Sequence, residues 1–395
     1  MSLPRKQLSQ QLQQVPRSGI RDFFELVQGR DDVISLGVGE PDFSAPWHIR
    51  EAAIYTLEQG NTSYTSNLGL RPLRDEISHY VAKRFAVHYD PAQEILVTVG
   101  VSEALDLAFR ALLNPGDEVI YHEPCYVSYN PSILLAYGIP VPVRTRLEDR
   151  FALRASDVAA AITPKTRAIV LNFPTNPTGG IEPVEELRQI AALAVEHDLI
   201  VITDEIYSEL IYDNEDVTVV PPHTSIASFP GMRERTILLH GFSKAFAMTG
   251  FRLGYSCAPH YITEAMMKIH QYAMLCAPIM SQTAGIEALR NGAERVEEMR
   301  REYAKRRNLM LSGFARIGIP CFPPGGAFYL FPDISRYGLS SKEFAHGLLN
   351  SQSVAVVPGS AFGPCGEGCV RACYATARDQ LEIALERIEL FVKSL

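Results

Sequence analysis

The middle of the chain alternates short apolar runs with stretches of helical periodicity, and this alternation restricts the fold more than any other feature. Six runs rich in Val, Ile and Leu are expected to form strands: residues 95–99, 118–121, 167–171, 199–203, 236–239 and 253–257. Between several of them, segments such as 102–113 and 183–197 have the spacing of helices. Strands separated by helices predict an α/β protein with a mostly parallel sheet covered on both faces. In such sheets a ligand site lies beyond the carboxyl ends of the strands.

The rest of the chain predicts a second, smaller unit. The pattern indicates a charged amphipathic helix over about 292–311, strands near 328–331, 354–357 and 370–374, and a terminal helix over 378–392. We therefore expect residues 48–291 to form a large sheet domain, and residues 1–47 together with 292–395 to form a smaller α+β domain.

Composition and charge exclude several classes of function. The 395 residues are 47% hydrophobic and 21% charged, which is ample material for a core. The net charge is −8 without a basic cluster, so neither nucleic acid nor an anionic membrane is an expected partner. The polar, glutamine-rich residues 1–16 contain no apolar stretch typical of a signal peptide, and no run is long enough to span a bilayer.

The cysteines indicate a reducing environment. Seven scattered cysteines, an odd number, favour the cytoplasm over a disulfide framework. Cys365, Cys369 and Cys373 recur at every fourth position, but the chain has no Cys-x-x-Cys pair and no histidine near them to complete a tetrahedral site. We expect no metal site.

The most informative motif is the run 243–255, which contains a lysine in a turn of small residues and an arginine eight positions later. The amine of Lys244 could condense with a carbonyl to form a Schiff base. The guanidinium of Arg252 could hold a phosphate through two parallel hydrogen bonds. Gly250 and Gly254 would let the backbone turn and pack closely there. This combination suits an aldehyde cofactor that carries a phosphate, whereas the plain alternative is a solvated surface lysine.

Polar residues also follow other predicted strands. Asp204 ends the apolar run 199–203, where a carboxylate needs a cationic partner such as a pyridinium nitrogen; a helix N-cap is an equally good interpretation. Asn176 lies in the turn 172–179, whose prolines and glycine would fix the direction of its amide or merely connect two elements.

A possible phosphate cradle begins after the first predicted strand. Gly100, Val101 and Ser102 open a helix there, and free N–H groups at a helix start favour an anion. An ordinary capped helix would have the same sequence.

Three further residues are ambiguous on sequence alone. Tyr126 lies just past the strand at 118–121 and would either stack on an aromatic ring or join the core. Tyr64 lies in a polar stretch and has the sequence context of an exposed loop residue. Arg371, in the near-apolar strand 370–374, calls for an anionic partner, and a carboxylate held by two hydrogen bonds would meet that need.

Together these motifs resemble those of the class I/II aminotransferases, fold-type I enzymes that use pyridoxal 5′-phosphate. The set is most similar to the bacterial and archaeal branch active on aspartate, aromatic amino acids or N-acetyl-diaminopimelate. Seven motifs in the family's order cover the chain from residues 39–43 to Arg371. The chain departs from the family at Val101, where many relatives have a smaller residue, and at Cys373, where serine is usual. The resemblance implies a large domain with a mostly parallel sheet and a smaller α+β domain.

The resemblance also implies a role for each motif residue. Lys244 would bind the cofactor and act as general acid/base, and Asp204 would keep the pyridine ring protonated. Tyr207, in the family's Asp-x-x-Tyr motif, and Asn176 would hydrogen-bond the phenolic oxygen of the cofactor. The remaining cofactor contacts would come from Val101, Ser102, Ser243, Arg252, the stacking ring of Tyr126, and Tyr64 of the partner subunit. Arg371, Gly39 and Asn176 would bind the substrate.

The expected function is transfer of an amino group between an L-amino acid, such as aspartate or an aromatic one, and a 2-oxo acid by a ping-pong mechanism. The expected protein is a cytoplasmic homodimer with shared active sites. A β-carbon–sulfur lyase on the same fold would use the same residues and stays open. A third interpretation is a non-catalytic sensor that binds pyridoxal phosphate. Such sensors usually carry an additional DNA-binding domain, for which the residues before Gly39 are too few, and the presence of Lys244 also argues against this interpretation. Residues 18–24 are expected to line the entrance, without fixing the substrate.

Overall fold

A seven-stranded sheet forms the centre of the larger part of the molecule in this computed structural model. The structure describes the chain except residues 1–8, 18, 21–28, 31, 214–215, 217 and 219–220. The strands of this sheet are β2 (Ile95–Thr98), β3 (Glu118–Glu123), β4 (Ile139–Arg144), β5 (Thr166–Leu171), β6 (Ile200–Asp204), β7 (Thr236–Gly241) and β8 (Gly254–Cys257). Their order is β2-β8-β7-β6-β5-β3-β4, and β8 alone among them runs antiparallel to its neighbours. The predicted mostly parallel sheet is confirmed.

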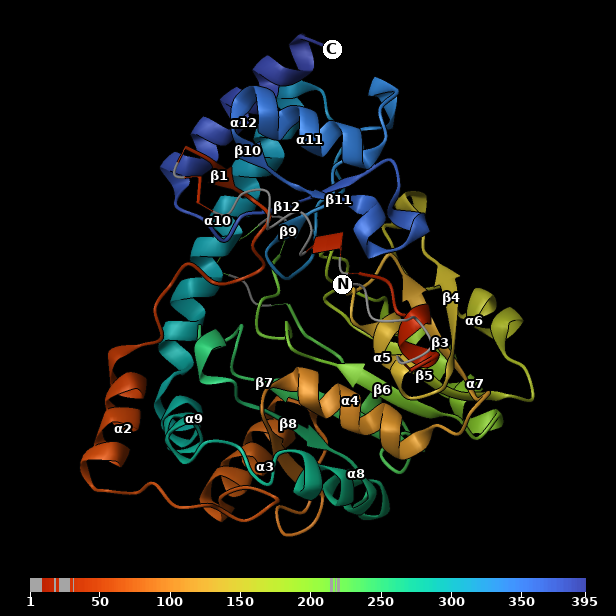
Figure 1. The fold of residues 1–395 in the computed structure, drawn as a ribbon, viewed down its shortest axis with the longest axis vertical. Helices are drawn as coiled ribbons and strands as arrows, with labels where there is room; N and C mark the ends of the chain where they lie inside the picture. The colour runs from red at the N-terminus through yellow and green to blue at the C-terminus, as the bar shows by residue number, and fades with distance from the viewer. Residues whose placement is uncertain are drawn as a thin grey trace, which may run out of the picture.

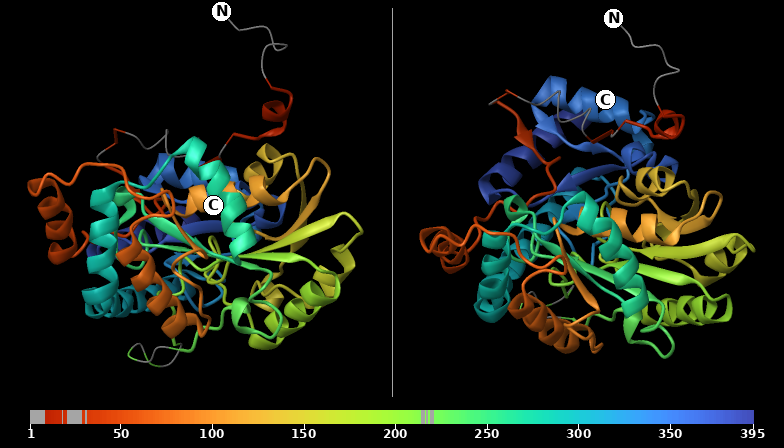
Figure 2. Two further views of the ribbon diagram at one scale, coloured as in Figure 1. Left: turned by 90° about the horizontal axis from the view of Figure 1, so that it is seen from below. Right: turned by 60° about the horizontal axis from the view of Figure 1, so that its bottom comes forward.

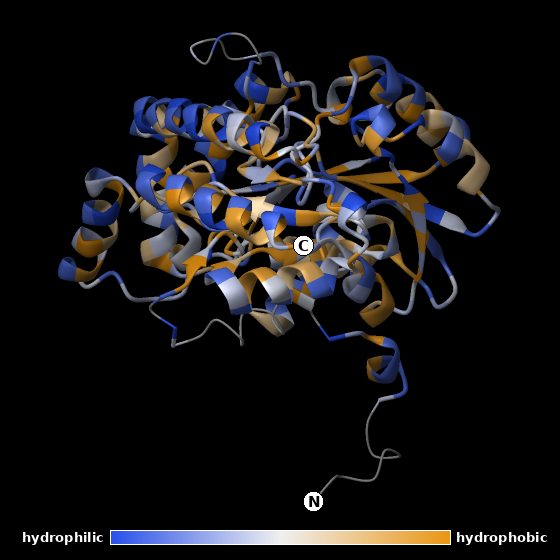
Figure 3. Ribbon diagram, turned by 90° about the horizontal axis from the view of Figure 1, so that it is seen from above, coloured by the Kyte–Doolittle hydropathy of each residue, from blue (hydrophilic) through white to orange (hydrophobic). Residues whose placement is uncertain are grey.

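Helices cover this sheet on both faces (Figures 1 and 2). The helices α4 (Val101–Leu112), α5 (Tyr129–Leu135) and α8 (His260–Ala273) share a core with one face. The helices α3 (Arg71–Phe85), α6 (Ala155–Ala161), α7 (Val184–Glu196) and α9 (Ile279–Asn291) cover the other, and α2 (Trp47–Glu58) lies against α9. Because successive side chains of a strand point to opposite faces, Val201 and Ile202 of β6 enter different cores. Figure 3 accordingly shows apolar strands inside and helices of mixed polarity around them.

Strand β4 was not predicted, and its sequence explains why. The strand contains Pro140 and Pro142, which cannot donate hydrogen bonds to a neighbouring strand. In the structure β4 is the edge strand and pairs on one side only, with β3. The missing donors can therefore face away from the sheet, and the prolines are tolerated.

The C-terminal part of the chain forms a smaller body, at the top of Figure 1. Its elements are α10 (Ala293–Ile317), β9 (Tyr329–Leu330), α11 (Ser341–Gln352), β10 (Val354–Ala355), β11 (Val357–Pro358), β12 (Val370–Cys373) and α12 (Arg378–Lys393), together with β1 (Ile34–Ser35) from the N-terminal part. Short 3-10 helices also occur in both parts of the molecule, at Gln11–Gln14, Leu147–Asp149, Ile226–Ser228, Thr249–Phe251, Ser335–Tyr337, Gly359–Phe362 and Pro364–Gly366.

The single strand expected at 354–357 is wrong. The chain there forms two strands that belong to different sheets: β10 pairs in parallel with β1, whereas β11 pairs antiparallel with β12. The apolar run is continuous because all four of its residues are buried, so hydrophobicity alone gives no sign of the break. Helix α11, which begins at a capping box between Ser340 and Glu343, was also not predicted.

Helix α10 connects the two bodies and fixes the segment that contains Gly39. It is longer than expected, and its polar residues are not all on the surface. Arg306 is buried and donates to both oxygens of Asp42, each at 2.8 Å. The pair holds residues 39–43 against the helix. Among the described residues, no helix has the length and apolar composition needed to cross a membrane.

The close packing between α10 and α12 predicts that a substitution there lowers the stability of the protein. Leu385 is 3% exposed, and a Cβ added to Gly313 of α10 would lie 2.4 Å from its Cδ1. Leu385→Ala should therefore lower the free energy of unfolding by about 2–5 kcal/mol, because the apolar contacts are lost and a cavity remains. Leu390→Ala on the same helix, where the side chain is 59% exposed, should change it by less than about 0.5 kcal/mol. Urea unfolding followed by circular dichroism compares the two, and equal effects would contradict this packing.

Candidate active site

A cavity of ≈ 380 Å³ opens at the carboxyl ends of β5, β6 and β7. Its size lies in the range of about 300–1,000 Å³ that is typical of small-molecule sites. The residues that line it are Ile20, Val38, Gly39, Glu40, Val101, Ser102, Leu105, Tyr126, Asn172, Asn176, Asp204, Ile206, Tyr207, Ser243, Lys244, Thr249, Arg252, Tyr329 and Arg371. Every site residue predicted from the sequence is present except Tyr64.

Lys244 follows β7 and points its amine into the cavity. The Nζ atom donates a hydrogen bond of 2.7 Å to the carbonyl oxygen of Gly39 and lies 5.8 Å from the centre of the Phe328 ring. Burial disfavours the charged ammonium and lowers the pKa of Lys244 to about 8. Near neutral pH a larger fraction of this amine is therefore neutral, and nucleophilic, than of an ordinary lysine.

Asp204 is the last residue of β6, and its carboxylate is buried. Oδ2 accepts a hydrogen bond of 2.9 Å from the hydroxyl of Tyr129, and Oδ1 accepts one of 3.3 Å from the backbone N–H of Ile206. The residues after Asp204 form a turn, so it does not cap a helix. Burial raises the pKa of Asp204 to about 6, although the hydrogen bond from Tyr129 acts in the opposite direction. A cationic ligand in the cavity would stabilise this carboxylate.

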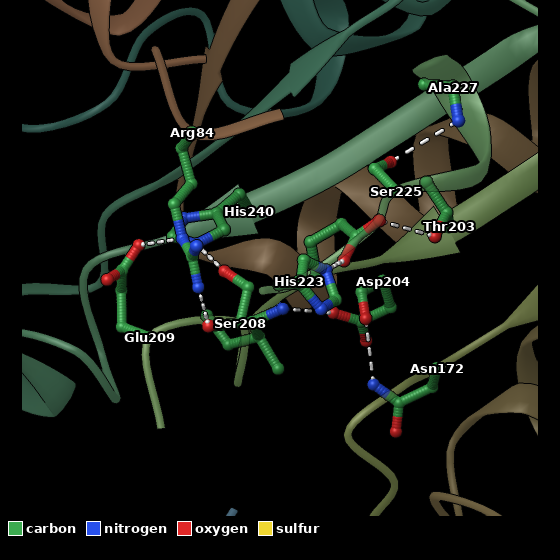
Figure 4. A network of polar contacts seen from close by, with 12 residues as sticks. Arg84, Asn172, Thr203, Asp204, Ser208, Glu209, His223, Ser225, Ala227 and His240 are labelled. Atoms are coloured by element: carbon green, nitrogen blue, oxygen red, sulfur yellow. Dashed lines mark hydrogen bonds and ion pairs between the residues drawn. The ribbon is translucent and has the colours of Figure 1, made fainter. Parts of the chain in front are cut away.

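A pair of tyrosines and a pair of asparagines occupy the wall beside Asp204. The hydroxyls of Tyr207 and Tyr329 lie 2.8 Å apart, and burial raises the pKa of both. The Asn172 side chain donates to the backbone oxygen of Asp204 at 2.9 Å (Figure 4) and accepts from the backbone N–H of Asn176 at 3.2 Å. These bonds fix the turn after β5 relative to the end of β6.

The start of helix α4 lies beside Arg252 in the cavity wall. Val101 and Ser102 are the first residues of the helix, so their N–H groups have no partner within it. A Cβ added to Gly100 would lie 2.7 Å from Nη2 of Arg252, and one added to Gly254 would lie 2.6 Å from Val101 N. Both glycines thus permit a close approach of the helix start, β8 and the guanidinium. With the Ser243 hydroxyl, this region combines donors and positive charge, as an anion such as phosphate requires.

Arg371 of β12 is 2% exposed and lies above the Tyr329 ring, with Cζ 4.5 Å from the ring centre. Nη1 donates to Asn176 Oδ1 at 2.9 Å, and Nη2 donates to the Gly37 carbonyl at 2.5 Å. Nε is buried and has no hydrogen-bond partner among the residues that the structure describes. A buried guanidinium with a free donor in a cavity wall is suited to binding a carboxylate.

Two predictions fall partly or wholly outside the cavity. Tyr64 is 83% exposed and does not line the cavity of its own chain. Of the segment 18–24, Ile20 lines the cavity, while residues 18 and 21–24 lie outside the described part of the chain. No group of His, Cys, Asp or Glu residues suitable for a metal ion occurs among the described residues.

Two contributors to the site, Tyr329 and Tyr129, were not predicted from the sequence. Tyr329 was expected only as part of an apolar strand, because an aromatic residue within such a run has the sequence context of core. Tyr129 was not singled out, since its contact with Asp204 joins residues far apart in the chain. Gly39, by contrast, was predicted. The structure shows why a glycine is needed at this position, because a Cβ there would lie 2.5 Å from the Tyr329 hydroxyl oxygen.

Comparison with known proteins agrees with this fold. The family model for aminotransferase class I and II matches residues 31–388. An aspartate aminotransferase of Pyrococcus abyssi is 47% identical, over 97% of each chain. An aromatic-amino-acid aminotransferase of Thermococcus litoralis is 44% identical, over 98% of each. The crystal structure of an aromatic aminotransferase from Pyrococcus horikoshii superposes with a TM-score of 0.89 at 46% identity, covering 95% of this chain and 99% of that one.

The chain therefore belongs to the class I and II aminotransferase family and is a transferase of amino groups. Enzymes of this family generally depend on pyridoxal phosphate.

The lowered pKa of Lys244 predicts that its amine reacts at lower pH than that of an ordinary lysine. In the cofactor-free protein, carbamylation of Lys244 by cyanate should be half-maximal near pH 8, because only the neutral amine reacts. A lysine in a short unstructured peptide, the control, has its midpoint near pH 10.4. Peptide mapping by mass spectrometry measures both, and coincident midpoints would show that the amine is not desolvated.

Proposed function

We propose that this chain is a pyridoxal 5′-phosphate-dependent aminotransferase that transfers the amino group of an L-amino acid, aspartate or an aromatic one, to a 2-oxo acid by a ping-pong mechanism. The observation that carries the proposal is that the amine of Lys244, the carboxylate of Asp204 and the guanidinium of Arg371 line one cavity. The named substrates of the Pyrococcus and Thermococcus relatives, aspartate and aromatic amino acids, support the substrate class.

The residues present fit the cofactor. The buried carboxylate of Asp204 is destabilised by its surroundings, and a protonated ring nitrogen would relieve this. The start of α4, Ser243 and Arg252 offer donors and charge for a phosphate. Tyr126 offers a ring for stacking, and the hydroxyl of Tyr207 with the amide of Asn176 offers polar contacts between these ends. The ring nitrogen, the ring face and the phosphate of the cofactor would thus each have a suitable partner in the cavity wall.

The reaction needs a proton moved at the α-carbon of the substrate. When bound, the cofactor supplies an electron sink for the charge left at that carbon. Lys244 Nζ, which is neutral in part at physiological pH, would take the proton from Cα and later return it. Asp204 would stay anionic above about pH 6 and hold the positive charge of the ring. Enclosure in the cavity strengthens both electrostatic effects.

Arg371 would orient the amino acid for this proton transfer. Its Nε and Nη2 lie on one edge of the guanidinium and can bind the two oxygens of an α-carboxylate, because Nη2 has a second N–H beyond its bond to Gly37, while Asn176 aligns the group through Nη1. Stacking on Tyr329 keeps the guanidinium in one plane. With the carboxylate fixed, the Cα–H bond has a restricted range of directions relative to Lys244.

The visible absorption spectrum tests the proposal. Purified protein loaded with pyridoxal phosphate should show a visible band that single amino acids bleach and that a 2-oxo acid restores. Lys244→Ala should reduce transamination by at least about a thousandfold, because the proton-transferring amine is lost, while cofactor still binds through its phosphate and ring contacts. Lys268→Ala, at an exposed lysine of α8, is the control and should keep full activity.

Two results would contradict the proposal. Near-normal transamination by Lys244→Ala would remove the central role of this amine. Steady release of ammonia and pyruvate, without bleaching of the band, would mean a lyase.

We also propose a homodimer whose two active sites are shared, with Tyr64 reaching the cofactor phosphate of the partner subunit. Tyr64 is exposed in one subunit, and nearby Asn67 donates to the backbone of Leu275, beside the exposed side chains of Tyr272 and Met274. An exposed apolar surface of this kind supports association.

Shared sites predict complementation between inactive variants. Lys244→Ala and Tyr64→Ala should each have low activity, and refolding an equal mixture should raise activity to about a quarter of the wild-type value. The reason is that half of randomly formed dimers are mixed and each mixed dimer contains one complete site. Activity of the mixture that only averages the two variants would contradict a shared site.

Two further proposals concern the division of the chain into domains and its cellular compartment. We propose a large domain of residues 48–291 and a small domain of residues 1–47 with 292–395. In support, one hydrophobic core joins Ile34 and Leu36 to residues of α10, α11 and α12, although Ile206 and Tyr207 also enter that core. Seven free cysteines support a reducing compartment, the cytoplasm.

A further inference from the structure

A second carboxylate lies directly behind the one in the cavity. Glu205 follows Asp204 in the chain, and strand alternation sends its side chain away from the cavity. It is 2% exposed, and its oxygens bind the hydroxyl of Thr203 at 3.0 Å and Nε2 of His223 at 2.6 Å (Figure 4). The charged partner and these hydrogen bonds hold the pKa of Glu205 below its usual range, so it is an anion at neutral pH.

The other groups around this pair determine what charge His223 must carry. Arg84 of α3 forms an ion pair with Glu209 at 2.7 Å, and the hydroxyl of Tyr80 donates to the same carboxylate at 2.5 Å. His240 of β7 is neutral, because burial lowers its pKa to about 4, and its Nδ1 accepts from the backbone N–H of Gly241.

With an imidazolium at His223, the charges of this cluster balance. Glu205 and Glu209 contribute two negative charges, and Arg84 contributes one positive charge. The imidazole of His223 is also largely buried and edge-on to the Phe85 ring. A neutral imidazole would leave one net negative charge in this interior, which is costly.

That net charge would act directly on the cavity. Glu205 is adjacent to Asp204, and its negative charge favours the protonated form of the Asp204 carboxyl group. The backbone between them is fixed, since Glu205 N donates to the Leu239 carbonyl and the Asn172 side chain donates to the Asp204 carbonyl. Neither carboxylate can move away from the other.

We propose that Glu205 and His223 are positioning residues that control the charge of Asp204, the imidazolium of His223 cancelling the charge of Glu205 so that Asp204 remains anionic toward the cofactor ring. This inference rests on the proposed function and deepens it. Neither Glu205 nor His223 lines the cavity, so the pair acts through Asp204.

The inference predicts opposite effects for the two halves of one ion pair. His223→Gln leaves Glu205 uncompensated, so Asp204 should take up a proton at higher pH. Glu205→Gln removes the negative charge adjacent to Asp204, so Asp204 should take up a proton at lower pH. A purely structural ion pair would respond alike to the loss of either member, with the same loss of stability.

The test measures binding of pyridoxamine 5′-phosphate to the cofactor-free protein by calorimetry between pH 5 and pH 8, a range that spans the ordinary pKa of histidine. This ligand has no aldehyde and cannot condense with Lys244, and its own ionisations are the same for every variant. In the wild type, affinity should fall as pH decreases through about 6, when Asp204 is protonated.

Relative to wild type, the midpoint of this fall should move up on the order of half a pH unit in His223→Gln and down by a similar amount in Glu205→Gln. The double variant, which restores the charge balance, should return to the wild-type midpoint. Thr203→Val removes a hydrogen bond to Glu205 without changing any charge, and its midpoint should not move.

Because each single variant has its own predicted sign, either one suffices if the other does not fold. Shifts in the same direction, or no shift in both, would overturn the inference while leaving the proposed function intact. A wild-type protein that binds neither pyridoxal phosphate nor pyridoxamine phosphate at any pH would overturn the proposed function, and this inference with it.

Discussion

The parallel pairing of β6 between β5 and β7 is the constraint on which the rest of the site depends. Parallel neighbours end at the same edge of a sheet, so the chain leaving each strand enters the same space. Asn172 follows β5, Asp204 ends β6, and Lys244 follows β7. A shift of β6 by one residue would turn Asp204 toward the opposite face and bring Glu205 into the cavity.

The smaller body contributes Tyr329 and Arg371 to the cavity wall. Arg371 of β12 contacts Gly37 from the N-terminal segment and Asn176 from the sheet edge, so three distant parts of the chain meet at one guanidinium. Gly39 and Tyr329 approach each other closely in the same region. Substrate binding through this arginine would therefore act on the relative placement of the two bodies as well as on the substrate itself.

Local sequence patterns predicted much of this arrangement, and their limits have physical causes. The apolar runs identified six of the seven strands of the large sheet. The polar residues at strand ends identified most of the cavity wall only together with the resemblance to the class I/II aminotransferases. Pattern failed for β4, where prolines are tolerated at an edge, and for the break between β10 and β11, where hydrophobicity is continuous. It also could not pair Glu205 with His223, because that contact depends on how a loop folds back onto the end of a strand.

The antiparallel strand β8 has a consequence for how the chain folds as it is made. Strand β2 pairs in the large sheet with β8 alone, and Ile95 is matched to Cys257. During synthesis from the N-terminus, β2 therefore waits for almost the whole sheet sequence to emerge before it acquires its neighbour. Until then its backbone edge is exposed, and closure through so long a loop is slow. The interval before β8 arrives is the stage at which the nascent protein is most open to wrong pairing with other chains.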